Sequence, residues 1–251
     1  MEAVFQKQVH IPASAVDRFD RLKLSTILDY LQEIAGDHCA LLGATRFDLA
    51  KKNLFWAVIR HRVVISRLPK AGEDIHLRTW PMPTTRTAYP RATEARDGQG
   101  NILFRCVSLW VLMDRDSRAM VLPGKSGVTV EGSLLGCEIE PCGSMPQRPR
   151  QNCDTRPVRY TDLDWNGHMN NCRYLDFVAD TQQSAFHGGN CCAEFSLCYF
   201  AEAHEGDALK LHWELDGEGL LSVDATRPDA ASSAGESRVF SARVRYENGV
   251  M

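Results

Sequence analysis

Apolar residues recur at helical spacing in two segments, one near the N-terminus and one after residue 174. The first segment ends at Gly43, which suits a helix C-cap, and the second ends at Gly188-Gly189. The periodic positions are Leu24, Ile27, Leu28, Leu31, Ile34, Ala35 and His38 in the first segment and Leu175, Val178, Ala179 and Ala185 in the second. The pattern therefore predicts one long helix in each part of the chain, with Asn170 or Asn171 capping the second.

Each predicted helix is followed by segments that are typical of β-strands and are bounded by turn residues. Asp97-Gly98, between two of these segments, indicates a hairpin turn. The predicted strands span residues 54–67, 74–81, 86–97 and 101–113 after the first helix, and 193–202, 208–216, 219–226 and 237–247 after the second. Their half-alternating patterns favour antiparallel sheets with one buried face.

The two parts of the chain also resemble each other in sequence, which indicates a duplication. The matches, in the same order in both copies, are Asp17 on Asp164 and Leu28-Asp29-Tyr30 on Leu175-Asp176-Phe177 at an offset of 147, then Asp74–Trp80 on Asp207–Trp213 at an offset of 133. Each match is weak alone, but two in the same order predict that the chain holds two copies of one unit.

A long helix followed by antiparallel strands predicts a sheet curled around that helix. Two such units side by side would form one continuous sheet with two helices, the α+β arrangement called a double hotdog, which periodicity alone does not single out. We predict an N-terminal hotdog over residues 1–136, a linker over 137–157 and a C-terminal hotdog over 158–251. The linker assignment rests on Pro141, Gly143, Pro146, Pro149 and Pro157.

Composition and charge narrow the class of protein without naming a function. The chain has 251 residues, 44% of them apolar and 24% charged, with a net charge of -3, which gives no reason to expect a nucleic acid or a membrane surface as partner. No apolar run is long enough to span a bilayer, and the N-terminus lacks the apolar core of a signal peptide, so we expect a cytoplasmic protein. No Cys-x-x-Cys pair or other ligand spacing occurs, so no metal site is predicted.

Candidate chemistry is concentrated in residues 162–171, DLDWNGHMNN. Asn-Gly is ordinary turn chemistry, yet the stretch also carries Asp164, Asn166 and His168, and Glu202 follows downstream. The duplication tests whether these residues are needed for the fold. In the first copy the corresponding positions are Asp17, Phe19, Arg21 and Pro69, so only the Asp is shared. Because one copy folds without the other three, the set favours a site over a plain turn.

The residue types suit acid–base chemistry. Histidine is the side-chain type best suited to exchange a proton in neutral solution, and a carboxylate such as Asp164 or Glu202 could hold the His168 ring and favour its imidazolium form. Asn166 offers a donor and an acceptor for a water or a carbonyl, and unpaired N–H groups at the start of the following helix could bind an oxyanion. No activated serine or cysteine is required, which favours hydrolysis of an activated acyl compound by water.

The stretch DLDWNGHMNNCRYLDF resembles the D-x-N-x-H-x-N-N-x-x-Y signature of acyl-acyl carrier protein (ACP) thioesterases of plants and bacteria, and the order of elements resembles that family over essentially the whole chain. The resemblance implies hydrolysis of fatty acyl-ACP to free fatty acid and ACP, without metal or organic cofactor. It also implies that Asp164, Asn166, His168 and Glu202 are catalytic. Plant members carry a Cys after that Glu, where this chain has Ala203, so we favour water as the nucleophile and leave Asp164 open as the alternative.

The resemblance further implies that the first unit supplies most of the acyl tunnel and that an acidic ACP meets a basic face. Tunnel candidates are Ile27, Tyr30, Leu31, Trp56 and Trp110, although such residues more often belong to a core. The basic clusters are Arg60, Arg62, Arg67 and Lys70, and Arg148, Arg150, Arg156 and Arg159. Three rival functions stay open: an acyl-coenzyme A thioesterase on the same fold, a non-catalytic lipid-binding hotdog protein, and a hotdog dehydratase. Chain-length preference and the choice between monomer and homodimer are also open.

Overall fold

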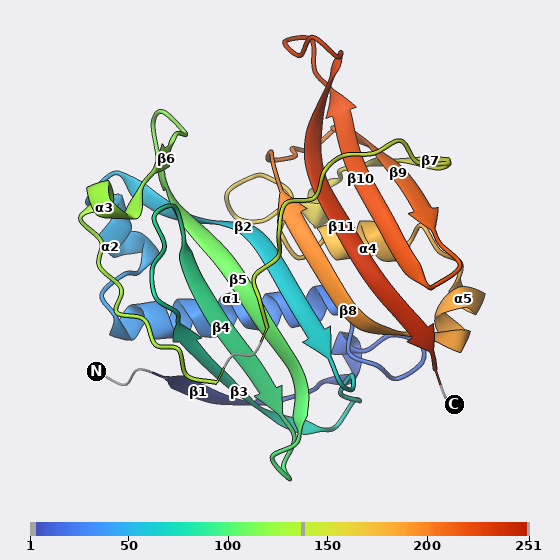
Figure 1. The fold of residues 1–251 in the computed structure, drawn as a ribbon, viewed down its shortest axis with the longest axis horizontal. Coiled ribbons are helices and arrows are strands. Elements are labelled where there is room, and N and C mark those ends of the chain that lie inside the picture. Colours follow the sequence, from blue (N-terminus) through green and yellow to red (C-terminus); the bar gives the residue numbers. More distant parts are fainter. Residues whose placement is uncertain (1–3, 137–138, 250–251) are drawn as a thin grey trace. The chain divides into compact units, whose positions relative to one another are not determined.

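The computed structural model describes residues 4–136 and 139–249, and the chain divides into two compact units. The first unit comprises the chain up to Lys23 together with Asp29–Cys142, and the second comprises Leu24–Leu28 together with Gly143 onward (Figure 1). Each unit combines helices with its own run of antiparallel strands, as the periodicity predicts. The boundaries at residues 136 and 158 stay a prediction.

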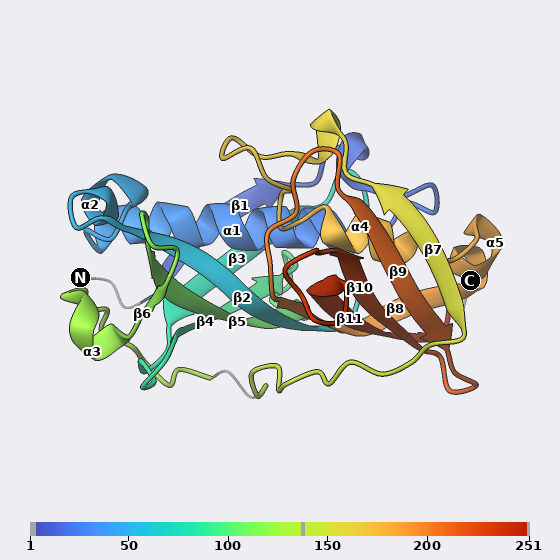
Figure 2. The ribbon, with the colours of Figure 1, turned by 90° about the horizontal axis from the view of Figure 1, so that it is seen from above.

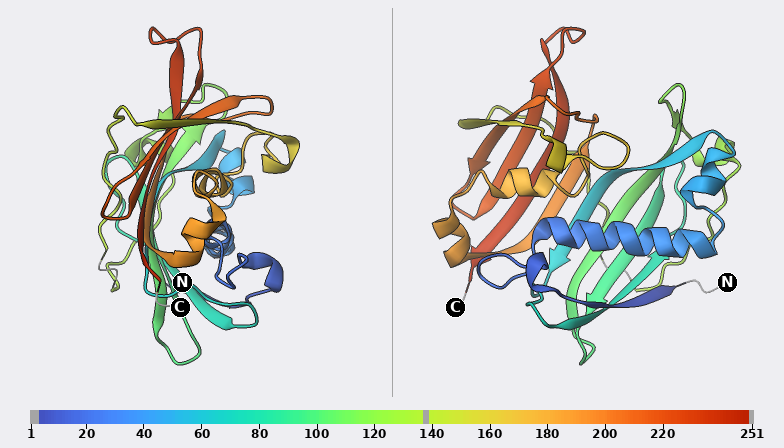
Figure 3. Two further views of the ribbon diagram at one scale, coloured as in Figure 1. Left: turned by 90° about the vertical axis from the view of Figure 1, so that its right-hand side faces the viewer. Right: turned by 180° about the vertical axis from the view of Figure 1, so that it is seen from behind.

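In the first unit the strands follow the order β1-β3-β4-β5-β2, all antiparallel, with the short β6 paired to β5. Its elements are β1 (Phe5–His10), the 3₁₀ turn η1 (Ala13–Ala15), α1 (Leu24–Leu41), α2 (Arg46–Ala50), β2 (Leu54–Ile65), β3 (Asp74–Pro81), β4 (Tyr89–Arg96), β5 (Ile102–Asp114), β6 (Met120–Val121) and α3 (Pro123–Ser126). The greater part of α1 lies along one face of this sheet, as the view from behind in Figure 3 shows. The four longer predicted strands of this unit are therefore present.

The helix α1 forms where the apolar spacing predicts it. Leu31 and Ile34 are almost completely buried, and burying each such side chain contributes about 1.5–3 kcal/mol. The helix ends because Gly43 takes a φ of +64°, which lets the Ala44 amide reach back to the Cys39 carbonyl at 3.0 Å. The predicted C-cap glycine is confirmed.

The hairpin between β4 and β5 is also where the sequence places it, but a different glycine shapes it. The residue with positive φ is Gly100, at +87°, and Gly98 is not among the residues with positive φ. The Asp97 carboxylate accepts the amides of Gln99 and Asn101 at 3.0 and 2.8 Å, so it organises a longer turn. The hairpin turn predicted at Asp97-Gly98 is present, as a loop that the Asp97 side chain caps from its start.

The sheet face beneath α1 carries polar groups as well as apolar ones. Arg91 of β4 donates to His38 Nδ1 of α1 at 3.1 Å, which places this face under the helix. Strand register puts Ser108 of β5 opposite Arg91 and His61 of β2 opposite Ser108, and the His61 Nδ1 to Ser108 Oγ distance is 2.8 Å. Burial lowers the pKa of His61 to about 3, so its imidazole is neutral in the folded protein.

The buried His61 is expected to make stability depend on pH. The unfolded chain takes up a proton on this residue below about pH 6.5, whereas the folded protein does not until about pH 3. The stabilisation is therefore fully present above pH 6.5 and is lost as pH falls, by about 2 kcal/mol between pH 7 and pH 5. Urea unfolding of wild type and His61→Gln at both pH values measures it, with exposed His76→Gln as the control. An equal loss in wild type and His61→Gln would contradict the assignment.

The second unit has the strand order β8-β11-β10-β9-β7, again antiparallel. Its elements are β7 (Asn152–Pro157), the 3₁₀ turn η2 (Tyr160–Asp162), α4 (Tyr174–Ala179), α5 (Ser184–Gly189), β8 (Asn190–Tyr199), β9 (Ala208–Leu215), β10 (Leu220–Pro228) and β11 (Glu236–Asn248). The strand β7 lies in residues that the proline-rich pattern assigned to the linker, and it pairs with β9. In Figure 2, α4 and the segment leading into β7 lie on opposite sides of this sheet.

The single long helix predicted for the second unit is wrong, because the segment is broken into α4 and α5. At the break, the Thr181 hydroxyl donates to the Val178 carbonyl at 2.8 Å, and the Gln182 amide bonds to Ala179 at 3.0 Å in a tighter turn. The His187 ring folds back and donates from Nε2 to the Ala179 carbonyl at 3.0 Å. Local side-chain bonds therefore end α4 where the apolar periodicity would have continued it.

Backbone hydrogen bonds confirm the duplication and correct its alignment. The strands β1 and β7 and the turns η1 and η2 match at the predicted offset of 147. The equivalent bonds further on are Leu22 N–H to Pro69 O (2.8 Å) and Met169 N–H to Ala203 O (2.7 Å), and Gly72 N–H to Ile11 O (2.9 Å) and Gly206 N–H to Val158 O (3.0 Å). These pairs set the downstream offset at 134, since 203 − 69 and 206 − 72 both equal 134. Glu202 therefore corresponds to Leu68 rather than Pro69, and the first unit still has no acid there.

Candidate active site

The stretch containing the signature is a turn, and the polar side chains are mounted on it. Leu163 and Met169 form an isolated antiparallel bridge, and the Asp164 amide bonds to the His168 carbonyl at 2.9 Å. Gly167 closes the loop with a φ of +83°, a conformation that glycine adopts without strain. The Asn-Gly pair therefore acts as turn chemistry and holds Asp164, Asn166 and His168 on one short loop.

Asp164 organises the loop through both carboxylate oxygens. Its Oδ1 accepts the Asn166 amide at 2.7 Å, and its Oδ2 accepts the Asn166 side-chain Nδ2 at 3.2 Å. Asp17 holds the equivalent loop of the first unit, where it binds the amides of Phe19 and Arg21 at 2.8 and 3.0 Å. The shared aspartate is thus explained by the turn, whereas Asn166 and His168 occur only in the second unit.

The His168 ring lies between two carboxylates. Its Nδ1 is 3.7 Å from Asp164 Oδ1, and its Nε2 is 3.5 Å from Glu202 Oε1. Glu202 is brought there by the Met169 to Ala203 backbone bond and by a bridge between His168 and His204. Both separations are longer than a typical direct hydrogen bond and lie in the range of ion pairs. The side chains of His168 and Asp164 are 22% and 20% exposed, so water reaches the ring.

Two aromatic side chains beside the site were not singled out from the sequence. Tyr174, the tyrosine of the signature, is buried and makes edge-to-face contacts with Tyr199 and Phe240 at 5.3 and 5.0 Å. Burial raises the pKa of its phenol, and the nearby charges of Glu202 and Asp164 raise it further. The signature itself could have indicated Tyr174. The ring of His204 stands edge-to-face to His168 at 6.2 Å, and no sequence signal marks that contact.

Most of the amides at the start of the following helix are engaged within the chain, and the oxyanion donors expected there stay a prediction. Helix α4 begins at Tyr174 with Arg173 at its N-cap, and no side chain caps it. Asn170 instead accepts the Cys172 amide at 2.9 Å in the preceding turn, and the Arg173 amide bonds to the Asn170 carbonyl at 2.9 Å. Asn166, which uses one of its two N–H donors on Asp164, is exposed and still has a donor for a carbonyl oxygen.

The residues predicted to line an acyl tunnel are internal to different degrees. On α1, Ile27 and Leu31 are fully buried, while Tyr30 is partly exposed. Trp56 and Trp110 pack against one cluster, formed by Leu49, Leu54, Tyr89 and Leu112. Trp56 also donates to the Ala44 carbonyl at 3.0 Å. These contacts are those of core residues, and the tunnel assignment stays a prediction.

Most of the basic residues proposed from the sequence to meet an acidic partner are used within their own unit. In the first cluster, Arg60 and Arg62 donate to the carbonyls of Cys142 and Glu140, and Arg67 pairs with Glu73 at 2.7 Å. In the second, Arg150 binds Asp224 at 2.9 Å, and Arg156 pairs with Asp180 and lies over the Phe177 ring. These arginines chiefly make hydrogen bonds and ion pairs within the chain, which weakens the hypothesis that they form a docking face for an acidic partner.

The described ranges contain no group of three histidine, cysteine, aspartate or glutamate side chains that could hold a metal ion. No helix within residues 4–136 and 139–249 is long and apolar enough to cross a membrane.

Comparison with known families assigns most of the chain to one family. The acyl-ACP thioesterase N-terminal domain matches residues 2–122, and the acyl-ACP thioesterase C-terminal domain matches residues 147–241. A chloroplastic palmitoyl-acyl carrier protein thioesterase of Gossypium hirsutum is 27% identical over 254 residues, which cover 93% of this chain and 58% of the relative. The chain therefore spans less than two thirds of that relative's length.

Two solved structures share the fold. An acyl-ACP thioesterase from Bacteroides thetaiotaomicron superposes with a TM-score of 0.88 at 23% identity, covering 98% of both chains. The 12:0-ACP thioesterase from Umbellularia californica superposes with a TM-score of 0.82 at 22% identity, covering 99% of both. The predicted α+β double hotdog is confirmed.

Proposed function

The chain belongs to the acyl-ACP thioesterase family, and from this premise we propose that it hydrolyses the thioester of fatty acyl-ACP to free fatty acid and ACP. The observation that carries the proposal is the His168 ring, accessible to water and set between Asp164 and Glu202. This arrangement can take a proton from water and stabilise the imidazolium that results. A protein that only binds lipid has no need of such a base.

In the proposed mechanism, a water bound beside His168 attacks the thioester carbonyl. A bond forms between the water oxygen and the carbonyl carbon while His168 takes the proton, and the two carboxylates favour the charged ring. The free N–H of Asn166 donates to the carbonyl oxygen as negative charge develops on it. The carbon–sulfur bond then breaks, and the imidazolium returns its proton to the departing thiolate.

Asp164 fits a positioning role better than that of nucleophile. Both of its oxygens accept hydrogen bonds from Asn166, at 2.7 and 3.2 Å, which lowers their electron density and fixes their direction. Cys172, also next to the loop, is buried, and the position after Glu202 is Ala203. Neither an aspartyl anhydride nor a thioester to cysteine is therefore needed, and we propose water as the attacking group.

The test compares carriers directly. Release of free fatty acid is measured from a panel of acyl-ACPs and from acyl-coenzyme A thioesters with the same chains. We expect a higher kcat/KM with ACP, and the panel also identifies the preferred chain length. Hydrolysis of the coenzyme A thioesters alone would identify the protein as an acyl-coenzyme A thioesterase. No hydrolysis of either substrate class would favour a lipid-binding protein. A cytoplasmic location, and a monomer or homodimer, stay predictions.

A further inference from the structure

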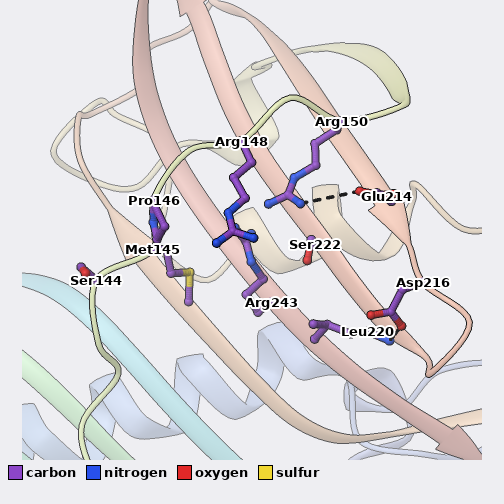
Figure 4. Close-up of a pocket in the computed structure, with 10 residues that line it drawn as sticks. All are labelled: Ser144, Met145, Pro146, Arg148, Arg150, Glu214, Asp216, Leu220, Ser222 and Arg243. Carbon is purple, nitrogen blue, oxygen red and sulfur yellow. Dashed lines mark hydrogen bonds and ion pairs between the residues drawn. The ribbon is translucent and has the colours of Figure 1, made fainter.

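A pocket lies on the second unit, between the segment leading into β7 and the strands beneath it. Its volume is about 450 Å³. Figure 4 shows Arg148 and Arg150 extending from that segment over the sheet, with Arg243 of β11 below them. Its lining residues are Ser144, Met145, Pro146, Arg148, Arg150, Glu214, Asp216, Leu220, Ser222 and Arg243.

Strand register places this pocket on the opposite face of the sheet from α4. Ser222 of β10 pairs with both Glu214 and Arg243, so these three side chains share one face. The other face carries Phe240 of β11, whose ring contacts Tyr174 of α4. Since Tyr174 lies beside the His168 loop, the pocket is separated from the proposed active site by the thickness of the sheet.

Two of the arginines that line the pocket, Arg150 and Arg243, also bind a buried carboxylate that does not line it, that of Asp224. Asp224 is inaccessible to solvent and binds Arg150 at 2.9 Å, Arg238 at 3.1 Å and Arg243 at 3.5 Å, besides the Ser241 hydroxyl. Burial would raise the pKa of Asp224, but the Ser241 hydrogen bond and the charges of Arg243 and Arg150 outweigh it and hold the pKa below its ordinary value. Because Glu214 also lies 3.8 Å from Arg150, two carboxylates face these three guanidinium groups.

Arg148 adds a further guanidinium that has no partner. It is exposed, and no hydrogen bond or ion pair engages it among the described residues. The side chain of Arg150 is only 8% exposed, and Arg243 uses one nitrogen on the carbonyls of Val223 and Ala242.

We propose that this pocket binds a phosphate group, either as the free ion or as a small phosphate ester. Guanidinium groups that come from two directions offer more donors than a planar carboxylate can accept, whereas the oxygens of a phosphate can accept several. The opposite wall carries Glu214 and Asp216, and Asp216 Oδ1 already accepts the amides of Glu218 and Leu220. These carboxylates suit hydroxyl or amino groups on the rest of an ester, and the volume exceeds that of a phosphate ion alone.

The test uses the full chain and two probes, inorganic phosphate and ribose 5-phosphate, with acetate at equal ionic strength to report non-specific anion effects. Binding is measured by isothermal titration calorimetry. We expect binding of at least one phosphate probe and not of acetate. Whichever of the two phosphate probes binds more tightly distinguishes the free ion from the ester.

Arg148→Gln should weaken phosphate affinity by about 10- to 150-fold, because it removes a charge-assisted contact to the anion. This variant keeps the fold because Arg148 has no partner to lose among the described residues. Arg159→Gln, an exposed arginine that does not line the pocket, should leave affinity unchanged. No binding of either phosphate probe, equal binding of acetate, or equal affinity in wild type and Arg148→Gln would overturn the proposal.

Discussion

Replacing His168 by alanine is expected to lower kcat/KM for acyl-ACP by about 10²- to 10⁴-fold, the range supplied by a positioned general base. The ring lies 3.7 Å from Asp164 and 3.5 Å from Glu202, so its removal takes away the proposed proton acceptor for the attacking water. The fold should be retained, because the loop is held by backbone bonds such as that between the Asp164 amide and the His168 carbonyl, which alanine preserves. Fatty-acid release from the preferred acyl-ACP measures the loss.

Two further measurements separate a base from a structural residue. Added imidazole should partly restore the rate of His168→Ala, because a small base can occupy the space left by the ring. The matched control is His212→Gln on β9, which lies opposite Asp224 on the face away from α4 and should retain wild-type activity. A His168→Ala variant within threefold of wild type would remove His168 from the mechanism, and a loss with no rescue would point to a structural role.

Replacing Asp224 by alanine is expected to lower the free energy of unfolding by about 3–5 kcal/mol, the usual cost of removing one partner from a buried ionic group. Asp224 is fully buried, and without it Arg150, Arg238 and Arg243 would lose the carboxylate that they share, while Arg150 alone of the three would keep its pair with Glu214 at 3.8 Å among the described residues. Urea unfolding at pH 7 measures the loss. The control is Glu205→Ala, an exposed position expected to change stability by at most about 0.5 kcal/mol.

The Asp224 carboxylate also predicts how the free energy of unfolding changes with pH. The pKa of Asp224 is lowered in the folded protein, so its stabilising contribution is present above the unfolded value and is lost as pH falls below about 4. Asp224→Ala should therefore show a smaller loss of stability than wild type as pH falls from 5 to 3. A loss below about 1 kcal/mol at pH 7, or identical acid dependence in both proteins, would contradict the role assigned to this network.

The sequence by itself determined the features that depend on local chemistry. The apolar spacing of α1, the terminating Gly43, the four longer strands of each unit and the Asn166-Gly167 turn all follow from the residues that form them. The comparison of the two copies distinguished the shared Asp17 and Asp164, which hold the same loop in both units, from His168, which occurs in one. The sequence alone allows this comparison, because each copy of the unit serves as the control for the other.

Tertiary structure decided what depends on residues distant in the chain. Equivalent hydrogen bonds made within each copy set the offset at 134, one residue more than the similarity around Trp80 and Trp213 indicated. The helix breaks between α4 and α5 because the Thr181 and His187 side chains bind backbone carbonyls there. The spacing of apolar residues does not indicate these hydrogen bonds. The partner of an arginine also depends on residues distant in the chain. Arg148 and Arg150 are two residues apart, yet only Arg150 forms an ion pair with Asp224. A pattern of residue types specifies which segments bury apolar surface, whereas the pairing of individual polar atoms is fixed only when strands distant in sequence come into register.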